Sequence, residues 1–84
     1  MAELYPSKSQ RLRDLEYRFV ALTRGPAADH APARLLEARG HLIRAKREHA
    51  GGLLADAQVS ADRVEEIVSQ LEGRWSSRAT ALKY

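Results

Sequence analysis

Apolar side chains recur along the chain at the three- and four-residue spacing of amphipathic helices, and they do so in three segments. The first segment covers residues 8–24, with one stripe formed by Leu12, Leu15, Phe19 and Leu22. Ser7 and Gln10 have the spacing of a capping box at its start. Gly25, which can take the left-handed conformation after a helix, and Pro26, which cannot extend one, follow its end. This pattern predicts a helix over residues 8–24.

The second segment, residues 30–50, carries its apolar side chains in two adjacent columns, a wider stripe than in the other segments. The columns contain Leu35, Leu36, Leu42, Ile43 and Ala50, and they continue into Leu53 and Leu54. We expect Asp29 to be the N-cap, with Pro32 tolerated in the first turn because amides there lack partners within the helix. Gly51 and Gly52 predict a break and then a short helical turn over 53–57, with a single helix over 30–57 as the alternative.

The third segment covers residues 61–82 and follows a heptad pattern, with Val64, Val68, Leu71, Trp75 and Leu82 on one seam and Arg78 as its one polar position. Ser60 is the candidate N-cap. No segment shows the alternation of β-branched residues that is typical of strands. The sequence therefore predicts an all-α single domain, 1–84, that is a small three-helix bundle or a helical hairpin plus a third helix.

Length and composition limit the size of the core and the class of protein. Of the 84 residues, 14 are Ala, so that only 23 larger apolar side chains remain. Together with the broad stripe of the second helix, this modest stock suggests that some apolar surface is shared with another chain. We expect a cytoplasmic protein, since there is no cysteine, no secretory signal and no apolar run of the roughly 18 residues that a membrane span needs. The excess of Arg over Lys and the abundance of Ala suggest a bacterial or phage origin.

The formal net charge of +3 is spread over a mixed surface and forms no basic stripe. Arg11 and Arg18 share one side of the first helix, whereas residues 62–72 are mostly acidic. We expect these two arginines to meet an acidic partner, either another protein or the acidic 62–72 segment of a second copy.

One column of the second helix, Glu37, His41, Arg44 and Glu48, combines residue types that bind metals. Arg44 would place a cation inside such a site, so we interpret the column as a solvated face with Glu37–His41 and Arg44–Glu48 pairs. The sequence contains no phosphate-binding loop and no nucleophile motif. We therefore expect no enzyme activity, no metal and no cofactor.

Residues 53–67 resemble the helix-turn-helix of bacterial regulators. In that resemblance Leu53 and Leu54 fill the first helix, Ala57 is the close-packing position, Val59 is the buried residue of the turn, and Val64 and Ile67 pack the second helix. Gln58 stands where the motif usually has Gly, and Asp62, Glu65 and Glu66 would face the DNA phosphates. The resemblance implies DNA binding through Arg63, with Arg74 and Arg78 of the basic C-terminal part as further contacts.

The sequence favours a non-enzymatic protein–protein interaction subunit of a larger bacterial or phage assembly, whose partner is another protein or copies of itself. The expected interface residues are Trp75, Leu71, Leu82 and Phe19 for apolar contact, with Arg11 and Arg18 at the charged rim. The alternative is a small helix-turn-helix DNA-binding protein.

Overall fold

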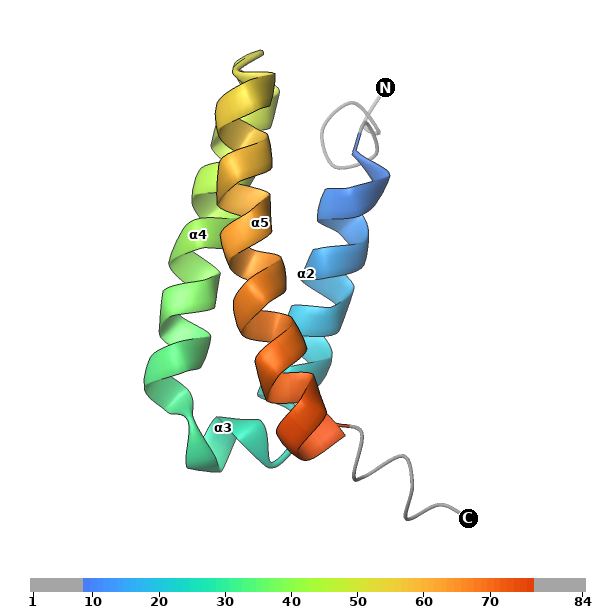
Figure 1. Ribbon diagram of the computed structural model, residues 1–84, viewed down its shortest axis with the longest axis vertical. Coiled ribbons are helices and arrows are strands. Elements are labelled where there is room, and N and C mark those ends of the chain that lie inside the picture. Colours follow the sequence, from blue (N-terminus) through green and yellow to red (C-terminus); the bar gives the residue numbers. More distant parts are fainter. Residues whose placement is uncertain (1–8, 77–84) are drawn as a thin grey trace.

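The computed structural model describes residues 9–76, in which three long helices run up and down, so that each is antiparallel to the next along the chain and the first and third run in the same direction (Figure 1). They are α2 (Gln10–Thr23), α4 (Pro32–Ala50) and α5 (Leu54–Leu71). A single turn of helix, α3 (Ala27–His30), connects α2 to α4, and five residues of π-helix, Glu72–Ser76, extend α5. The all-α three-helix architecture predicted from the sequence is confirmed.

The first helix begins later than its sequence pattern predicts. Ser9 is the N-cap and its hydroxyl accepts a hydrogen bond of 3.1 Å from the amide of Leu12. The capping box predicted at Ser7 falls outside the described residues. Gly25 directly follows the C-cap Arg24, as the pattern predicts, but its φ is not positive, so it does not take the left-handed conformation.

The second helix begins two residues later than predicted, at Pro32 rather than at His30. Ala31 separates α3 from α4 with φ −140° and ψ 54°. A residue that precedes proline is sterically excluded from the helical region, while proline itself suits the first helical position. Asp29 consequently lies within α3, and no side chain caps α4.

Gly51 and Gly52 end α4, as the sequence predicts, and the alternative of one helix over 30–57 is wrong. Gly52 has φ +85°, the left-handed conformation that glycine adopts without steric cost. Its amide donates to the carbonyl of His49, and the amide of Leu53 donates to that of Glu48 at 2.8 Å, the pattern of a Schellman motif. This tight turn places α5 directly against α4.

The third helix begins at Leu54, so the predicted break between a short turn and a helix starting at residue 61 is wrong. Ser60 does not act as an N-cap but lies buried inside the helix, where its hydroxyl donates to the Glu48 carboxylate at 2.8 Å. Ala57 and Ala61 are buried beside it, and such small side chains let two helices approach closely. Packing against α4 therefore keeps α5 helical through Ser60, where the local sequence alone predicts a helix start.

The core fills the space between the three helices and contains most of the predicted stripes of the first and third helices, with Phe19 and Trp75 packed against its edge. Its members are Leu12, Leu15, Leu22, Ala27, Leu35, Ala38, Leu42, Ala45, Ala61, Val64, Ile67, Val68 and Leu71. In α4 only one of the two predicted apolar columns is covered, because Leu36 and Ile43 remain 66% and 42% exposed. No helix within residues 9–76 has the length and apolar character needed to span a membrane.

Candidate functional site

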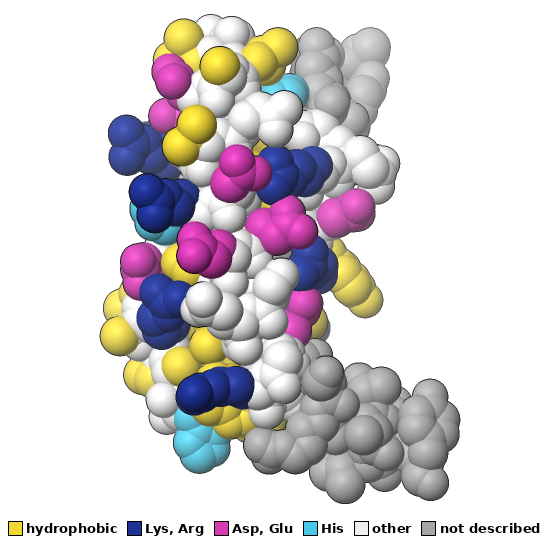
Figure 2. All heavy atoms as spheres, in the orientation of Figure 1, with side chains coloured by type: hydrophobic (Ala, Val, Ile, Leu, Met, Phe, Trp, Pro, Cys, Tyr) yellow, Lys and Arg dark blue, Asp and Glu magenta, His cyan; other side chains and the backbone are white. Residues whose placement is uncertain are grey.

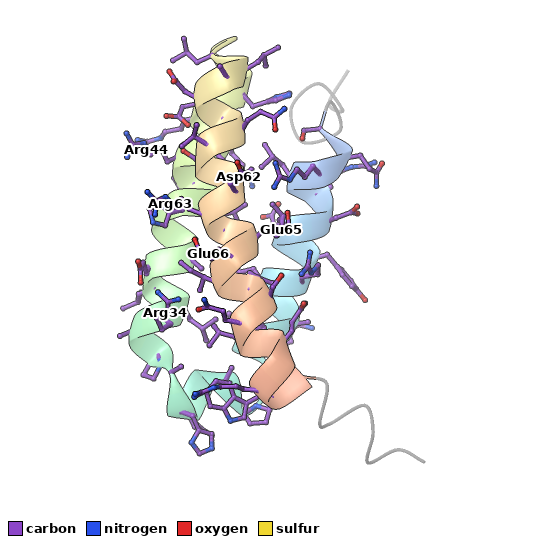
Figure 3. The ribbon with its side chains drawn as sticks, viewed as in Figure 1. Arg34, Arg44, Asp62, Arg63, Glu65 and Glu66 are labelled. Atoms are coloured by element: carbon purple, nitrogen blue, oxygen red, sulfur yellow. The ribbon has the colours of Figure 1, made fainter. Side chains whose placement is uncertain are left out.

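Helix α2 has two long sides with different surroundings, and one of them faces the acidic part of α5. On this α2–α5 seam the guanidinium of Arg11 donates to the carboxylates of Asp62 and Glu65, each at 2.7 Å, and to the amide oxygen of Gln58 at 3.2 Å. Asp62 and Glu65 point from α5 toward α2 (Figure 3). In Figure 2 dark-blue and magenta side chains alternate over this face of the molecule.

Arg18 completes the α2–α5 seam two turns farther along α2. Its guanidinium forms a two-pronged pair with Glu72, with N–O distances of 2.8 and 3.0 Å, and also donates to Ser69. The sequence predicted that Arg11 and Arg18 would meet another protein or the acidic 62–72 segment of a second copy, whereas in the structure they pair with that segment of their own chain. The predicted charged rim is thus largely occupied by intramolecular ion pairs.

These ion pairs raise the pKa of both guanidiniums above the ordinary arginine value. For Arg11 the hydrogen bonds to Glu65 and then Asp62 raise the pKa most, and burial partly opposes them. For Arg18 the hydrogen bond to Glu72 is the largest cause, again opposed by burial. Both groups stay charged at any physiological pH, so the α2–α5 seam does not act as a pH switch through its arginines.

The predicted apolar interface residues lie in or against the chain's own core. Leu71 is only 4% exposed and belongs to the core, so it is not available to a partner in this fold. Phe19 and Trp75 are half-buried and pack against the core from its edge. The Trp75 ring stacks on His30, with centroids 5.6 Å apart and planes nearly parallel, which closes the α3 end of the bundle. Leu82 lies outside the described residues.

In residues 53–67 the structure does not contain the motif on which the DNA-binding alternative rests. The turn that a helix-turn-helix needs near Val59 is absent within α5, because residues 54–71 form one continuous helix. Arg63 is exposed on the side of α5 toward α4, and Glu66 lies near it in Figure 3. Arg74 lies over the Trp75 ring, at 5.6 Å from its centroid, and Arg78 lies outside the described residues.

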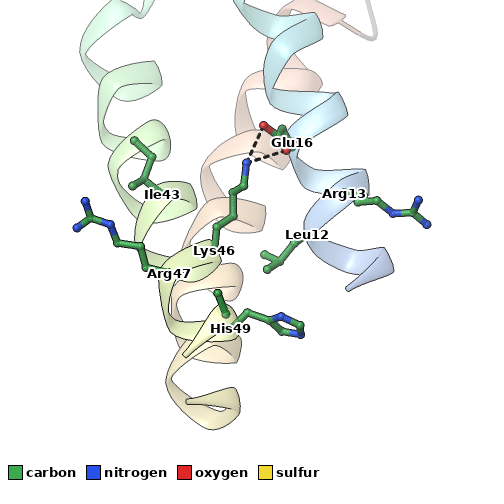
Figure 4. Close-up of a pocket in the computed structure, with 8 residues that line it drawn as sticks. Leu12, Arg13, Glu16, Ile43, Lys46, Arg47 and His49 are labelled. Atoms are coloured by element: carbon green, nitrogen blue, oxygen red, sulfur yellow. Dashed lines mark hydrogen bonds and ion pairs between the residues drawn. The ribbon is translucent and has the colours of Figure 1, made fainter. Parts of the chain in front are cut away.

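The other long side of α2 forms a groove with α4, on the face of the bundle away from α5 (Figure 4). We call it the α2–α4 groove. Its volume is about 410 Å³, and it is lined by Leu12, Arg13, Glu16, Ile43, Lys46, Arg47, His49 and Ala50. A smaller hollow of about 190 Å³ at the start of α2 shares Leu12 and His49 with it and continues to Leu54 and Ala57.

Helix periodicity explains why α4 presents an apolar wall to this groove. Leu36, Ile43 and Ala50 are seven residues apart, so they lie on one face of α4. They belong to the second apolar column that the sequence shows, the column that neither α2 nor α5 covers. Val20, one turn beyond Glu16 on α2, is also exposed. Exposed apolar side chains therefore continue beyond the groove, at Leu36 on α4 and at Val20 on α2.

The charges at the α2–α4 groove are less balanced than those at the α2–α5 seam. One ion pair crosses the groove, from the Lys46 ammonium to both carboxylate oxygens of Glu16 at 3.1 and 3.0 Å (Figure 4). Within residues 9–76 Arg13 and Arg47 have no carboxylate partner, and Arg13 donates only to the amide oxygen of Gln10. The rim of the groove is therefore positively charged around an apolar floor.

Three of the four residues in the predicted column of α4, which are Glu37, Arg44 and Glu48, form ion pairs. Arg44 pairs with Glu48 at 3.3 Å, as predicted, while Glu37 pairs with Arg34 and not with His41. Glu48 also accepts the hydrogen bond from Ser60, and Arg34 reaches Gln70 on α5. These polar contacts join α4 to α5, and among residues 9–76 no cluster of three potential metal ligands is present.

The sequence did not identify the α2–α4 groove as a site, although one signal pointed to it. That signal is the width of the apolar stripe on α4, which is more than its two helical neighbours cover. The chain matches no protein-family model, no curated protein and no solved structure.

Proposed function

We propose that this protein is a non-enzymatic helical interaction subunit that binds another polypeptide as part of a larger assembly, bacterial or phage in origin. The observation that carries the proposal is the apolar wall of the α2–α4 groove, which no part of residues 9–76 covers. Surfaces of this kind in small proteins mark binding sites, because exposed apolar area is costly unless a partner covers it.

The shape of the groove supports a polypeptide ligand. Two antiparallel helices form its walls, and the apolar positions on α4 extend beyond the pocket to Leu36. A surface that is long and apolar, with charged side chains at its edge, has the anatomy of a protein interface. We assign recognition to this groove, and we assign the arginines of the α2–α5 seam to holding α2 in place.

The test is a capture experiment with three immobilised forms of the protein: the unchanged chain, Ile43→Asp and Val59→Asp. Val59 is a matched control because it is also an exposed apolar residue, 60% exposed, but lies on α5. Bound protein and bound nucleic acid are both quantified after washes at low and high salt. Circular dichroism on each variant checks that the helices are intact.

We expect a stoichiometric protein that survives high salt on the unchanged chain and on Val59→Asp, and is lost on Ile43→Asp. Equal retention on Ile43→Asp would show that the groove is not the recognition surface. Nucleic acid that leaves steeply as salt rises would instead support the DNA-binding alternative, because phosphate contacts are strongly salt-dependent.

A further inference from the structure

The imbalance of charge around the α2–α4 groove indicates the chemistry of its ligand, and we propose that the groove binds an acidic amphipathic helix of a partner protein. This inference rests on the proposed function and adds the class of partner. It starts from the rim, where Arg13 and Arg47 have no carboxylate partner within residues 9–76. Carboxylates on an incoming segment would form ion pairs with these arginines. Asp62, Glu65 and Glu72 form such pairs with the arginines of the α2–α5 seam.

The spacing of the apolar residues on α4 matches a helix. From Leu36 through Ile43 to Ala50 the wall covers 15 residues of α4, with about 21 Å between the first and the last, or roughly four turns of a helix lying along it. A partner helix that presents apolar residues at three- and four-residue spacing would match this wall turn by turn. A β-strand is excluded as the ligand, because the backbone groups of α2 and α4 are bonded within their own helices and offer no sheet edge.

Gly40 lies between Leu36 and Ile43 on the same exposed part of α4, and nothing within the described chain requires a glycine there. A Cβ built at Gly40 has no atom within 4 Å. Glycine inside an exposed helix costs about 1 kcal/mol relative to alanine, so its place in the middle of α4 has no benefit for the isolated chain. A helix docked along α4 could approach most closely at this position.

The same features favour a protein over a nucleic acid as the ligand. The floor of the groove is apolar, with Leu12, Ile43 and Ala50, and covering it with a sugar–phosphate backbone would leave its apolar surface without a matching contact. An acidic amphipathic helix matches both parts of the site, with apolar side chains for the floor and carboxylates for the rim.

The experiment is a selection from a display library of random 20-residue segments on the purified full chain. Binders are counter-selected against Ile43→Asp, so that only ligands of the groove are kept, and they are sequenced for apolar spacing and net charge. A 20-base-pair DNA duplex is measured separately as a probe of nucleic-acid binding. We expect groove-dependent segments with helical apolar spacing and an excess of Asp and Glu.

The outcomes separate this inference from the proposed function. Groove-dependent segments that are neutral or basic would overturn the acidic-helix inference and leave a protein-binding groove. No enrichment on the unchanged chain over Ile43→Asp would overturn both. If the affinity for the duplex depended on Ile43 and exceeded the affinity for every selected segment, the ligand of the groove would be DNA and not a protein.

A charge-reversal pair tests the rim directly with one selected acidic segment. Arg47→Glu should weaken its binding about fivefold, because one favourable pair is lost and a repulsive one is created. Arg63→Glu changes the net charge by the same amount on α5 and should weaken binding less than about twofold. Equal effects of the two variants would show that only net charge matters and would overturn the assignment of Arg47.

Discussion

Arginines lie on both sides of α2, but within residues 9–76 they have carboxylate partners on one side and none on the other. At the α2–α5 seam Arg11 and Arg18 meet three carboxylates of their own chain, and the charges are neutralised where they lie. At the α2–α4 groove Arg13 and Arg47 remain without such partners beside an apolar wall. The arginines of the seam thus serve the fold, whereas those at the groove are the ones that we assign to a partner.

The comparison also separates what holds the fold together from what is offered to a partner. The seam arginines are partly exposed, and ion pairs of this kind contribute about 0.2–1 kcal/mol each. Most of the free energy that fixes α2 therefore comes from its buried leucines, which lie between the seam and the groove. We therefore assign stability to the core and the α2–α5 seam, and recognition to the α2–α4 groove. Variants in each region test this assignment.

The largest expected effect lies in the core beneath α2. Leu15→Ala should lower the free energy of unfolding by about 2–5 kcal/mol, because Leu15 is only 1% exposed and its removal leaves a cavity. Chemical denaturation monitored by circular dichroism measures the change. A loss below about 1 kcal/mol would mean that α2 is not anchored by this contact, and the assignment of stability to the core would fail.

The next effect in size compares Arg18 of the α2–α5 seam with Arg47, which lies on α4 at the α2–α4 groove. Arg18→Ala should cost about 1 kcal/mol of unfolding free energy, since it removes a two-pronged pair with Glu72, while an alanine at Arg47 should change it by less than about 0.5 kcal/mol. The same denaturation curves at low and high salt measure both. The Arg18 effect should shrink at high salt, and equal costs for both variants would contradict the contrast between seam and groove.

The seam is also expected to be insensitive to pH over the range in which its carboxylates are ionised. Because the pKa of Arg11 and of Arg18 is raised in the folded state, their contribution is complete below the unfolded-state value and is lost only above it. The difference in stability between the unchanged chain and Arg18→Ala should therefore stay constant between neutral pH and about pH 10. A difference that disappears within this range would show that another group controls the seam.

A smaller effect of opposite sign is expected on the groove side. Gly40→Ala should raise the free energy of unfolding by about 0.5–1 kcal/mol, because the position is helical and exposed and a Cβ meets no atom within 4 Å. Thermal unfolding gives the direction, and Gly40→Leu then tests the docked helix. The leucine variant should fold normally but bind the partner more weakly, whereas unchanged binding would remove Gly40 from the contact surface.

The smallest effect on stability is expected at the centre of the groove. Ile43→Gln should change the free energy of unfolding by no more than about 0.5 kcal/mol, because the side chain is 42% exposed and lies outside the core. Binding of the partner should nevertheless fall. A large loss of stability would mean that Ile43 contributes to the fold, and the groove would then be part of the core.

The sequence predicted more of the fold than of the site. Helical spacing located all three long helices, and the stripes of the first and third helices identified core residues such as Leu15, Val64 and Val68. The turn at Gly51 and Gly52 followed from the conformational freedom of glycine. Of the site, the sequence showed only that the second helix is apolar over a wider face than the others.

The errors arose where a local signal competed with packing between helices. Ser60 has the chemistry of an N-cap, yet it lies inside α5 because the Glu48 carboxylate of α4 accepts its hydrogen bond. Leu71 and Trp75 were expected to contact a partner, yet Leu71 lies in the chain's own core and Trp75 packs against it. In both cases the residue would suit either a local role or a partner contact, and in the fold it contacts a neighbouring helix instead.

By itself the sequence determined most of each helical segment, the end of α4 at Gly51 and Gly52 and the width of each apolar stripe, because these are properties of one segment at a time. Only the tertiary structure decided that the acidic part of α5 pairs with Arg11 and Arg18, and that Leu36 and Ile43 remain uncovered. The physical reason is that a helix has more faces than its neighbours can cover. Which face stays open depends on how all three helices rotate to bury their leucines together.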